Sequence, residues 1–313
     1  MSELATSLSV RIFAVIVLYK TAPLDSISFQ TLQNAIAHSS GNKTTVRVFF
    51  YDNTPEGQPP EIFPRGVSYE SPNKNAGLAA AYNRALEIAY EEGFDWLLTL
   101  DQDTELPIDF ICKLGDAAAF VTPMSDIAAI VPQIYDRDRM ISPNTLLCDI
   151  FPRFFPAGFV GISRQKTSAV NSAATIRISA LRKIGGYDPR FWLDYSDAVM
   201  FHRLDCSNMR VFVAGNIRVQ HELSVLDMKN RVTIERYNDI LGAESAFWDE
   251  YMGKIAGPAL LIRFLYRLCY KLWRTGASPQ YFRTSLRFFY RRFFYSRNRR
   301  MEAWELSAKQ RLK

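Results

Sequence analysis

The sequence predicts an α/β domain with a mostly parallel sheet, followed by a basic helical extension. In the first hundred residues, short apolar runs rich in β-branched and aromatic residues alternate with stretches that favour helix. Acidic residues directly follow two of these runs. The charge is also divided, because residues 258–313 carry 14 Lys/Arg and two acids while the net charge of the whole chain is +6. The body of the chain is therefore acidic and its tail strongly basic.

The composition is that of a globular protein, with 48% apolar and 22% charged residues in 313. Four cysteines without a CxxC pair indicate free thiols in a reducing compartment rather than disulfides or a zinc site. The N-terminus lacks the features of a signal peptide, and the apolar run at Phe13–Tyr19 is too short to span a bilayer. We therefore expect a cytoplasmic protein.

The expected elements follow from these patterns in order. Strands are predicted at Phe13–Tyr19, Val46–Tyr51, Val67–Tyr69 and Trp96–Leu100, with helices at Ser28–Ser39 and Leu78–Glu91. Further along, the sequence predicts a helix at Ser179–Ile184 that ends at Gly185-Gly186, and two short strands at Val211–Ala214 and Ile217–Gln220. In a parallel sheet, ligands bind beyond the carboxyl ends of the strands, where Asp52 and the Asp101-Gln102-Asp103 triplet fall.

Two basic amphipathic helices are predicted in the tail, at Pro258–Thr275 and Tyr281–Tyr295. Their Arg and Lys residues recur every three or four positions, with Leu and Phe between them. Such helices lie on an anionic membrane surface, pack on the body or a second subunit as in a homo-oligomer, or bind nucleic acid. The helical spacing of the charges favours the first two interpretations over nucleic acid.

The acidic triplet has the residue types of a divalent-metal site. Asp101 and Asp103 flank one residue after a buried strand, so both carboxylates can point the same way. Two converging carboxylates are hard oxygen ligands for Mg²⁺ or Mn²⁺ and leave positions open for diphosphate oxygens. Asp52, at the mouth of the same sheet, is placed to accept a hydrogen bond from a pyrimidine base.

The segment from Asn73 to Asn83 supplies a loop followed by a helix. Gly77 permits an unusual loop conformation or close approach of a ligand. For Asn75 and for Asn83, turn and cap chemistry is as good an explanation as a role in ligand binding.

Taken in order, Asp52, the N-x-N-x-G-x-x-x-x-x-N segment and LTLDQD resemble the family 2 glycosyltransferases, most closely the rhamnosyltransferase-like branch. The resemblance covers about residues 11–222. It implies a GT-A fold, in which a Rossmann-like nucleotide-binding sheet is fused to an acceptor-side subdomain. It also implies a nucleotide-sugar donor, a divalent metal, and inversion at the anomeric carbon. The donor-binding candidates are Tyr19, Asp52, Asn75, Gly77, Asn83 and Asp101, and the metal candidates are Asp103 and His221.

Residues 171–203 resemble the acceptor-side block of the family, in which GG(F/Y)D precedes an acidic segment. Asp197 takes the position of the general base in that block, and an inverting transfer needs such a carboxylate near the acceptor hydroxyl. Trp192 and Asp194 are candidates for acceptor binding. Relatives often carry a second acid two residues after the base, where this chain has Val199. If that acid were the true base, Asp197 would be misassigned.

These inferences predict a GT-A domain at residues 1–222, with the nucleotide-sugar half at about 1–105 and the acceptor half at 106–222. A helical region at 223–313 follows, which we expect to hold the enzyme at the inner face of the cytoplasmic membrane. The resemblance favours transfer of L-rhamnose from dTDP-L-rhamnose to a bacterial surface-polysaccharide precursor, with a glycan or lipid-linked glycan as acceptor. The alternatives are UDP-galactose, UDP-galactofuranose or UDP-GlcNAc as donor, or a non-catalytic membrane-associated scaffold.

Overall fold

The computed structural model describes residues 9–39, 43–58, 62–147, 151–221, 232–252, 262–263, 265–266 and 279–312. Nearly all of the predicted helix at Pro258–Thr275 lies outside these residues. The main sheet has nine strands in the order β3-β2-β1-β4-β11-β5-β12-β9, with β6 paired to β5. Its strands are β1 (Val10–Leu18), β2 (Thr44–Asp52), β3 (Val67–Glu70), β4 (Trp96–Asp101), β5 (Ile127–Asp136), β6 (Arg139–Ser142), β9 (Val160–Ile162), β11 (Ala174–Arg177) and β12 (Arg210–Gln220). A second sheet, in the order β10-β7-β8, contains β7 (Asn144–Leu147), β8 (Phe151–Phe154) and β10 (Thr167–Ser168).

The sheet is mixed rather than purely parallel. Strands β3, β2, β1 and β4 run parallel, and β5 and β12 run parallel to each other. Strand β11 lies between these two groups and is antiparallel to both of its neighbours, β4 and β5. The first group is the alternating half that the sequence predicts, and β11 joins it to the second half of the chain.

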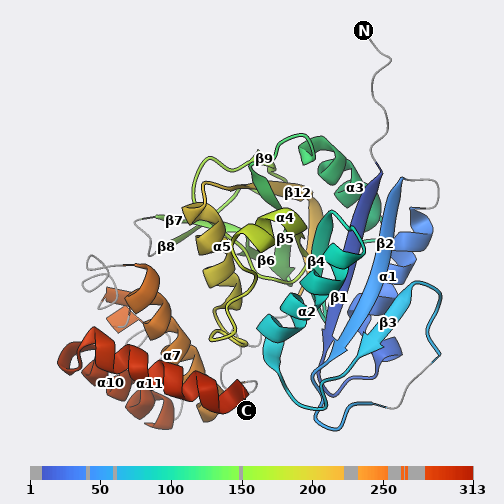
Figure 1. Ribbon diagram of the computed structural model, residues 1–313. Helices are drawn as coiled ribbons and strands as arrows, with labels where there is room; N and C mark the ends of the chain where they lie inside the picture. The colour runs from blue at the N-terminus through green and yellow to red at the C-terminus, as the bar shows by residue number, and fades with distance from the viewer. Residues whose placement is uncertain are drawn as a thin grey trace.

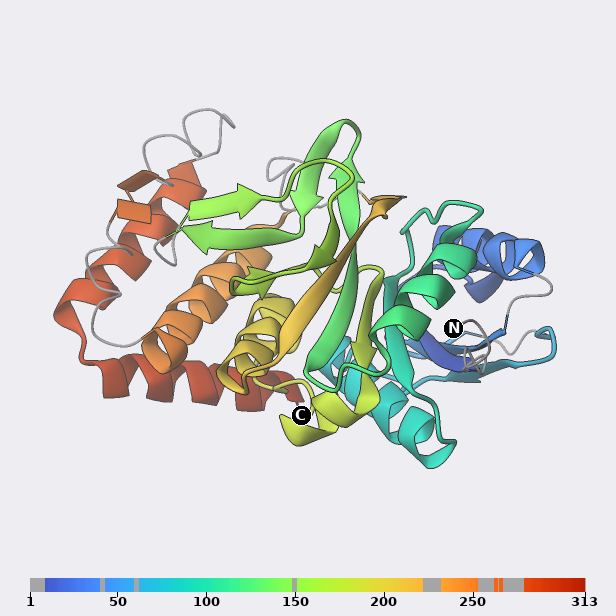
Figure 2. The ribbon, with the colours of Figure 1, turned by 90° about the horizontal axis from the view of Figure 1, so that it is seen from above.

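Helices cover both faces of the sheet (Figures 1 and 2). The helices of the first 221 residues are η1 (Pro23–Asp25), α1 (Ile27–His38), α2 (Gly77–Glu91), α3 (Phe110–Val121), α4 (Ile178–Lys183) and α5 (Ser196–Cys206). One buried cluster joins α1 and α3 to one face, and another joins α2, α4 and α5 to the opposite face. Alternate residues of β1 enter the two clusters, as expected for a strand buried on both sides.

The predicted elements of the first half are confirmed, with boundaries that differ by at most three residues. Strand β1 ends at Leu18, so Tyr19 is the first residue of the following loop. Helix α4 ends as predicted at Gly185-Gly186, where both glycines have positive φ and the Gly186 N–H donates to the Leu181 carbonyl. The prediction of two short strands at Val211–Ala214 and Ile217–Gln220 is wrong, because both belong to β12. The register of β12 against β5 shifts between Ala214 and Arg218, so the chain crosses an irregularity without leaving the sheet.

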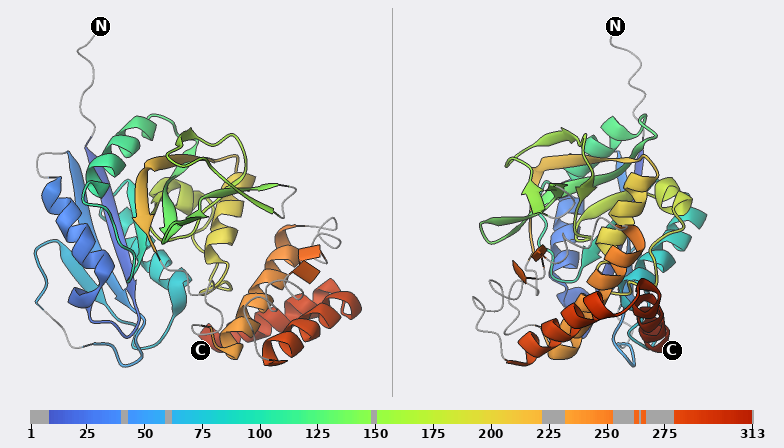
Figure 3. Two further views of the ribbon diagram at one scale, coloured as in Figure 1. Left: turned by 180° about the vertical axis from the view of Figure 1, so that it is seen from behind. Right: turned by 90° about the vertical axis from the view of Figure 1, so that its left-hand side faces the viewer.

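Three helices near the C-terminus pack together beside the α/β domain (Figures 1 and 3). They are α7 (Ile234–Tyr251), α10 (Pro279–Phe294) and α11 (Arg297–Leu312), and α10 corresponds to the predicted helix at Tyr281–Tyr295. Helix α7 contacts both α10 and α11. A buried cluster that includes Phe191, Val199, Phe247 and Trp304 ties these helices to α5 and the segment before it. In the described parts of the chain, no helix combines the length and apolar character that crossing a membrane requires.

Candidate active site

The acidic triplet lies in a turn that the start of helix α1 holds in place. The Ser28 hydroxyl donates to the Asp101 and Thr104 carbonyls, and the Thr104 N–H donates back to Ser28 Oγ at 2.8 Å. The backbone carbonyl of Gln102 accepts from Ser26 Oγ at 2.9 Å. The side-chain oxygen of Gln102 accepts from the Tyr19 N–H at 2.7 Å. Backbone oxygens of the turn are therefore held by hydrogen bonds from the start of α1.

His221 is brought to this turn by strand β12. Glu105 and Gln220 pair through two backbone hydrogen bonds, and the His221 N–H donates to the Tyr135 carbonyl at 2.9 Å. The imidazole then lies between the two carboxylates, with Nε2 3.5 Å from Asp101 Oδ2 and Nδ1 3.5 Å from Asp103 Oδ1. The structure thus joins residues that are more than a hundred positions apart in the sequence.

A neighbouring hydroxyl orients the first carboxylate. The buried Ser172 side chain donates to Asp101 Oδ2 and lies 3.3 Å from His221 Nε2. Of the three site side chains, His221 is almost fully buried at 5% exposure, and Asp103 is the most accessible at 51%. A ligand from solvent therefore meets Asp103 first.

The donor set of this cluster fits a hard divalent cation, since carboxylate oxygens and an imidazole nitrogen are ligands that Mg²⁺ or Mn²⁺ accept. Nevertheless, among the residues that the structure describes, no group of three or more His, Cys, Asp and Glu side chains is arranged to hold a metal ion. The assignment of Asp103 and His221 as metal ligands stays a prediction.

Asp52 lies at the carboxyl end of β2 and is fully buried. Its Oδ1 accepts from the Thr54 N–H at 2.9 Å, and its Oδ2 accepts from Gln58 Nε2 at 2.9 Å and from the Tyr69 hydroxyl at 2.8 Å. Both oxygens thus already have protein donors and fix the loop after β2. A pyrimidine base that bonds to Asp52 has to share or displace one of these donors.

The predicted donor loop is held by the residue after Asp52. The buried Asn53 side chain accepts from the Ala76 N–H at 3.0 Å and donates to the Gly77 carbonyl at 3.2 Å. Asn75 makes a local turn, because its side chain accepts from the Gly77 N–H at 3.2 Å. Gly77 begins α2 with φ +82°, and a Cβ there would lie 2.5 Å from the Trp192 carbonyl oxygen. Glycine is required at this position by both conformation and close approach.

Trp192 therefore contacts the start of α2. Its carbonyl oxygen accepts from the Leu78 N–H at 2.6 Å and from the Ala79 N–H at 3.2 Å. These two hydrogen bonds satisfy two amides at the N-terminus of the helix that have no partner within the helix. Trp192 joins the donor loop to the acceptor-side block, and its prediction as an acceptor-binding wall has no support in these contacts.

Asn83 has a structural partner far along the chain. Its side chain donates to the Tyr187 carbonyl and accepts from the Tyr187 N–H, both at 2.8 Å. A Cβ on Gly186 would lie 2.5 Å from Asn83 Oδ1, so the second glycine of the GGYD segment makes room for this pair. These contacts tie the acceptor-side block to α2, and the role of Asn83 in donor binding stays a prediction.

Of the two predicted acceptor-binding residues, Asp194 lines a cavity of about 430 Å³ and Trp192 does not. Asp197 in the first turn of α5 and Asp194 just before it both border this space, along with Tyr195. Tyr195 precedes α5 with φ +66°, a left-handed conformation that turns the chain sharply into the helix. Both carboxylates therefore border this cavity, which we call the acceptor cavity because it is the candidate acceptor site.

The environment of Asp197 suits a general base. Burial raises the pKa of Asp197 to about 6, and the charges of Asp194 and Asp101 act in the same direction. The Ala198 N–H donates to Asp197 Oδ1 at 2.7 Å and opposes the shift in pKa. A carboxylate with this pKa is ionised at neutral pH and is a stronger base than an ordinary aspartate.

Tyr82 also belongs to this region, although no sequence motif indicated it. Tyr82 is fully buried in α2, and its ring packs on Tyr187 with 4.9 Å between centroids. Its hydroxyl has no hydrogen-bond partner in the described part of the chain. Burial raises the pKa of Tyr82 well above its usual value, and the charges of Asp101 and Asp197 add to the effect. The phenol is therefore influenced by both the donor-side and the acceptor-side carboxylate.

Helix α7 forms one wall of the acceptor cavity. Ile240, Phe247 and Trp248 of α7 line it, opposite residues of β8 and β10. The Phe247 ring packs against Tyr195 at 5.7 Å between centroids, and Arg236 lies 3.7 Å from Asp194. The C-terminal region thus completes the cavity, which the sequence alone did not predict.

Several residues that build the site carried no sequence signal: Ser28, Asn53, Tyr82, Thr104 and Ser172. Ser28 and Asn53 have the residue types of a helix start and a turn, so only their long-range partners distinguish them. Tyr82 and Ser172 lie in stretches without an evident motif. Their roles depend on the contact between the two halves of the chain.

Comparisons with known proteins agree with this architecture. The model of the family described as Glycosyl transferase family 2 matches residues 36–185, slightly less than half of the chain. No curated protein was found to match the sequence. The chain resembles the crystal structure of S. aureus TarS 1–349 in complex with UDP, with a TM-score of 0.54, 12% identity, and coverage of 96% of this chain and 88% of that one. It also resembles the crystal structure of GalNAc-T7 with UDP, GalNAc and Mn²⁺, with a TM-score of 0.53 and 14% identity.

The second similarity covers 96% of this chain but only 58% of the GalNAc-T7 chain. At such low identity these likenesses show the fold alone. The fold is that of the GT-A glycosyltransferases, as the sequence predicts, with a helical C-terminal region added.

Proposed function

We propose that this protein is an inverting glycosyltransferase that moves a sugar from a nucleotide-diphosphate donor to a glycan acceptor. The observation that carries the proposal is the convergence of Asp101, Asp103 and His221 at the carboxyl end of β4. A separate carboxylate with a raised pKa, Asp197, lines a cavity on the acceptor side. The match of residues 36–185 to glycosyl transferase family 2 supports the same reaction class.

The roles of the residues follow from their positions. Asp197 accepts the proton of the acceptor hydroxyl while the hydroxyl oxygen bonds to the anomeric carbon of the donor sugar. The bond from that carbon to the diphosphate oxygen breaks, and the nucleoside diphosphate leaves with the electron pair. Asp101 and Asp103, with His221, would hold a bound Mg²⁺ or Mn²⁺. Such an ion would neutralise charge on the leaving diphosphate.

The loop around Asp52 and the segment at Asn75–Gly77 would bind the nucleoside. A pyrimidine base suits a carboxylate acceptor at Asp52, and Tyr19 is exposed beside it at the end of β1. The two similar structures both contain UDP, which is a pyrimidine nucleotide. We favour dTDP-L-rhamnose from the resemblance of the sequence, with UDP-galactose, UDP-galactofuranose and UDP-GlcNAc as the alternative donors.

We further propose that the acceptor is a lipid-linked precursor of a bacterial surface polysaccharide. The enzyme would then act from the cytoplasm at the inner face of the membrane. Basic helices in residues 223–313 support this location, because each basic residue near an anionic membrane contributes about 1 kcal/mol of attraction. We divide the chain into a GT-A domain at 1–222 and a helical region at 223–313, and α7 of the second part also serves the acceptor cavity.

Donor binding is the first step to test. Thermal melting with dTDP-, UDP- and GDP-sugars, each with Mg²⁺, Mn²⁺ or EDTA, should show metal-dependent protection by one pyrimidine nucleotide sugar. Asp103→Asn should abolish this protection, since Asp103 is the most accessible carboxylate of the cluster. Asp116→Asn, a change of an exposed acid on α3, is the matched control and should retain it.

Donor turnover then separates the two carboxylate functions. Asp197→Asn should bind the donor like the wild type but lose sugar transfer, with kcat reduced by at least about a hundredfold for loss of a general base. Equal protection in wild type and Asp103→Asn, or normal transfer by Asp197→Asn, would contradict the assignment. Protection without any turnover by the wild type on a panel of acceptors would favour the non-catalytic scaffold.

A further inference from the structure

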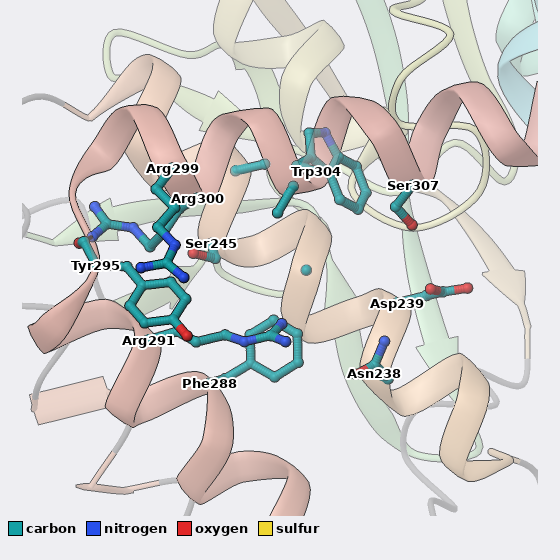
Figure 4. Close-up of a pocket in the computed structure, with 13 residues that line it drawn as sticks. Asn238, Asp239, Ser245, Phe288, Arg291, Tyr295, Arg299, Arg300, Trp304 and Ser307 are labelled. Carbon is teal, nitrogen blue, oxygen red and sulfur yellow. Dashed lines mark hydrogen bonds between the residues drawn. The ribbon is translucent and has the colours of Figure 1, made fainter.

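A second cavity lies between helices α7, α10 and α11 (Figure 4). The α7 residues that line it are different from those that line the acceptor cavity. Its volume is about 170 Å³. Figure 4 shows Arg291, Tyr295, Arg299 and Arg300 at one end, whereas Asn238, Asp239 and Ser307 lie toward the other. The cavity therefore has a strongly basic end.

The positive charge at this end exceeds the negative charge beside it. Asp249 is buried and accepts from Arg292 at 2.5 Å and from Arg300 at 2.6 Å, so one carboxylate already serves two guanidinium groups. Arg291 and Arg299 make no ion pair within the part of the chain that the structure describes; their guanidinium groups instead lie over the rings of Phe288 and Tyr295. Asp239 is the only acid among the described lining residues, and it lies toward the other end of the cavity.

Arg291 is only partly accessible to solvent, which makes its charge costly. Burial lowers the pKa of Arg291, and the neighbouring charge of Arg287 lowers it further. An anion bound at the cavity would offset both effects. Paired guanidinium groups recognise phosphate through charge-assisted hydrogen bonds, and the Tyr295 side chain also lines this end.

Helix α10 also carries an exposed apolar stripe next to the basic end of the cavity. Phe282, Leu286, Tyr290, Phe293 and Phe294 are all exposed, and their spacing places them on one side of the helix. Arg283, Arg287 and Arg291 form an adjacent stripe at four-residue intervals, between the apolar side and the cavity. Aromatic side chains at the depth of lipid headgroups, bordered by arginines, fit an anionic membrane surface.

We propose that the cavity between α7, α10 and α11 binds the phosphate of an anionic phospholipid headgroup while the apolar stripe of α10 lies in the headgroup region of the membrane. The helical wheel places Arg291 at the border of both surfaces, so a lipid beside α10 can present its phosphate to Arg291 and Arg299. This inference rests on the membrane location proposed above but does not depend on the transferase reaction.

Vesicle binding by the full chain tests the proposal. The probes are vesicles of phosphatidylcholine alone and with phosphatidylglycerol, scored by co-sedimentation. Two double variants remove the same charge: Arg291→Gln with Arg299→Gln in the cavity, and Arg283→Gln with Arg287→Gln on the exposed stripe. If only diffuse electrostatic attraction to the membrane acts, both variants should lose the same amount of vesicle binding, about 30-fold in partition coefficient for two charges.

A headgroup site predicts that the cavity variant loses at least tenfold more binding than the stripe variant, and only on phosphatidylglycerol vesicles. Equal losses in the two variants, or no loss in either, would overturn the site. Binding of inorganic phosphate by the wild type without binding of vesicles would overturn the lipid assignment. Thermal protection by the nucleotide sugar, measured on the same samples, reports folding and donor binding separately, so failure of the proposed function cannot be mistaken for failure of this site.

Discussion

Replacing Asp197 with asparagine should stabilise the protein near neutral pH while it removes activity. Asp197 is held in a site where burial and two nearby carboxylates disfavour its charge, with a pKa of about 6 against a usual value of 3.8. Asparagine has nearly the same shape and retains an oxygen that can accept from the Ala198 N–H. The substitution therefore removes the cost of the charge with little change in packing.

The magnitude follows from the two pKa values. Between pH 4 and 6 the folded chain retains a proton at Asp197 that the unfolded chain releases, so the folded state loses stability relative to the unfolded state as the pH rises through this window. Above pH 6 the carboxylate is ionised in both states and the full cost is present. The difference between the two pKa values corresponds to about 3 kcal/mol at pH 7. Below pH 4 the wild type and Asp197→Asn should be equally stable.

Urea unfolding of the wild type and Asp197→Asn at several pH values, in EDTA to exclude divalent cations, measures this effect. The control is Asp138→Asn, because the Asp138 side chain is fully exposed and its change should alter stability by less than about 0.5 kcal/mol. In parallel, kcat/KM of the wild type should rise with pH through about 6. A destabilised Asp197→Asn variant, or a stability difference that does not depend on pH, would refute the account of the Asp197 environment.

Two other substitutions probe the contacts that assemble the site. Gly77→Ala should destabilise the protein by more than about 2 kcal/mol, since it combines a positive φ with a Cβ 2.5 Å from a backbone oxygen. The control, Gly66→Ala, has φ +85° and no atom within 4 Å of the added Cβ, so it should cost about 1 kcal/mol. Equal melting temperatures for the two variants would contradict the clash at Gly77. Asp249→Ala should destabilise the protein by about 3 kcal/mol or more, because it leaves two partly buried arginines unpaired. The control, Asp126→Ala, breaks an exposed pair with Arg210 and should cost less than about 1 kcal/mol. Similar losses of stability for both variants in chemical denaturation would refute the prediction.

Much of the first half could be predicted because its signals are local. The apolar runs of β1, β2 and β4 and the residues that follow them are adjacent in the sequence, so periodicity identified both the strands and the position of Asp101. The prediction of two strands where β12 runs continuously failed for the opposite reason. Pairing with β5 holds β12 together across its irregularity, and no local pattern records that pairing.

The sequence by itself determined the α/β architecture, the carboxylates at the ends of β2 and β4, and the division between an acidic body and a basic tail. Only the tertiary structure decided which distant residues meet. It brought His221 between Asp101 and Asp103 through the pairing of Glu105 with Gln220. It also made α7 a wall of the acceptor cavity. Hydrophobic periodicity depends on neighbours along the chain, whereas a site depends on contacts that form only when separate elements pack.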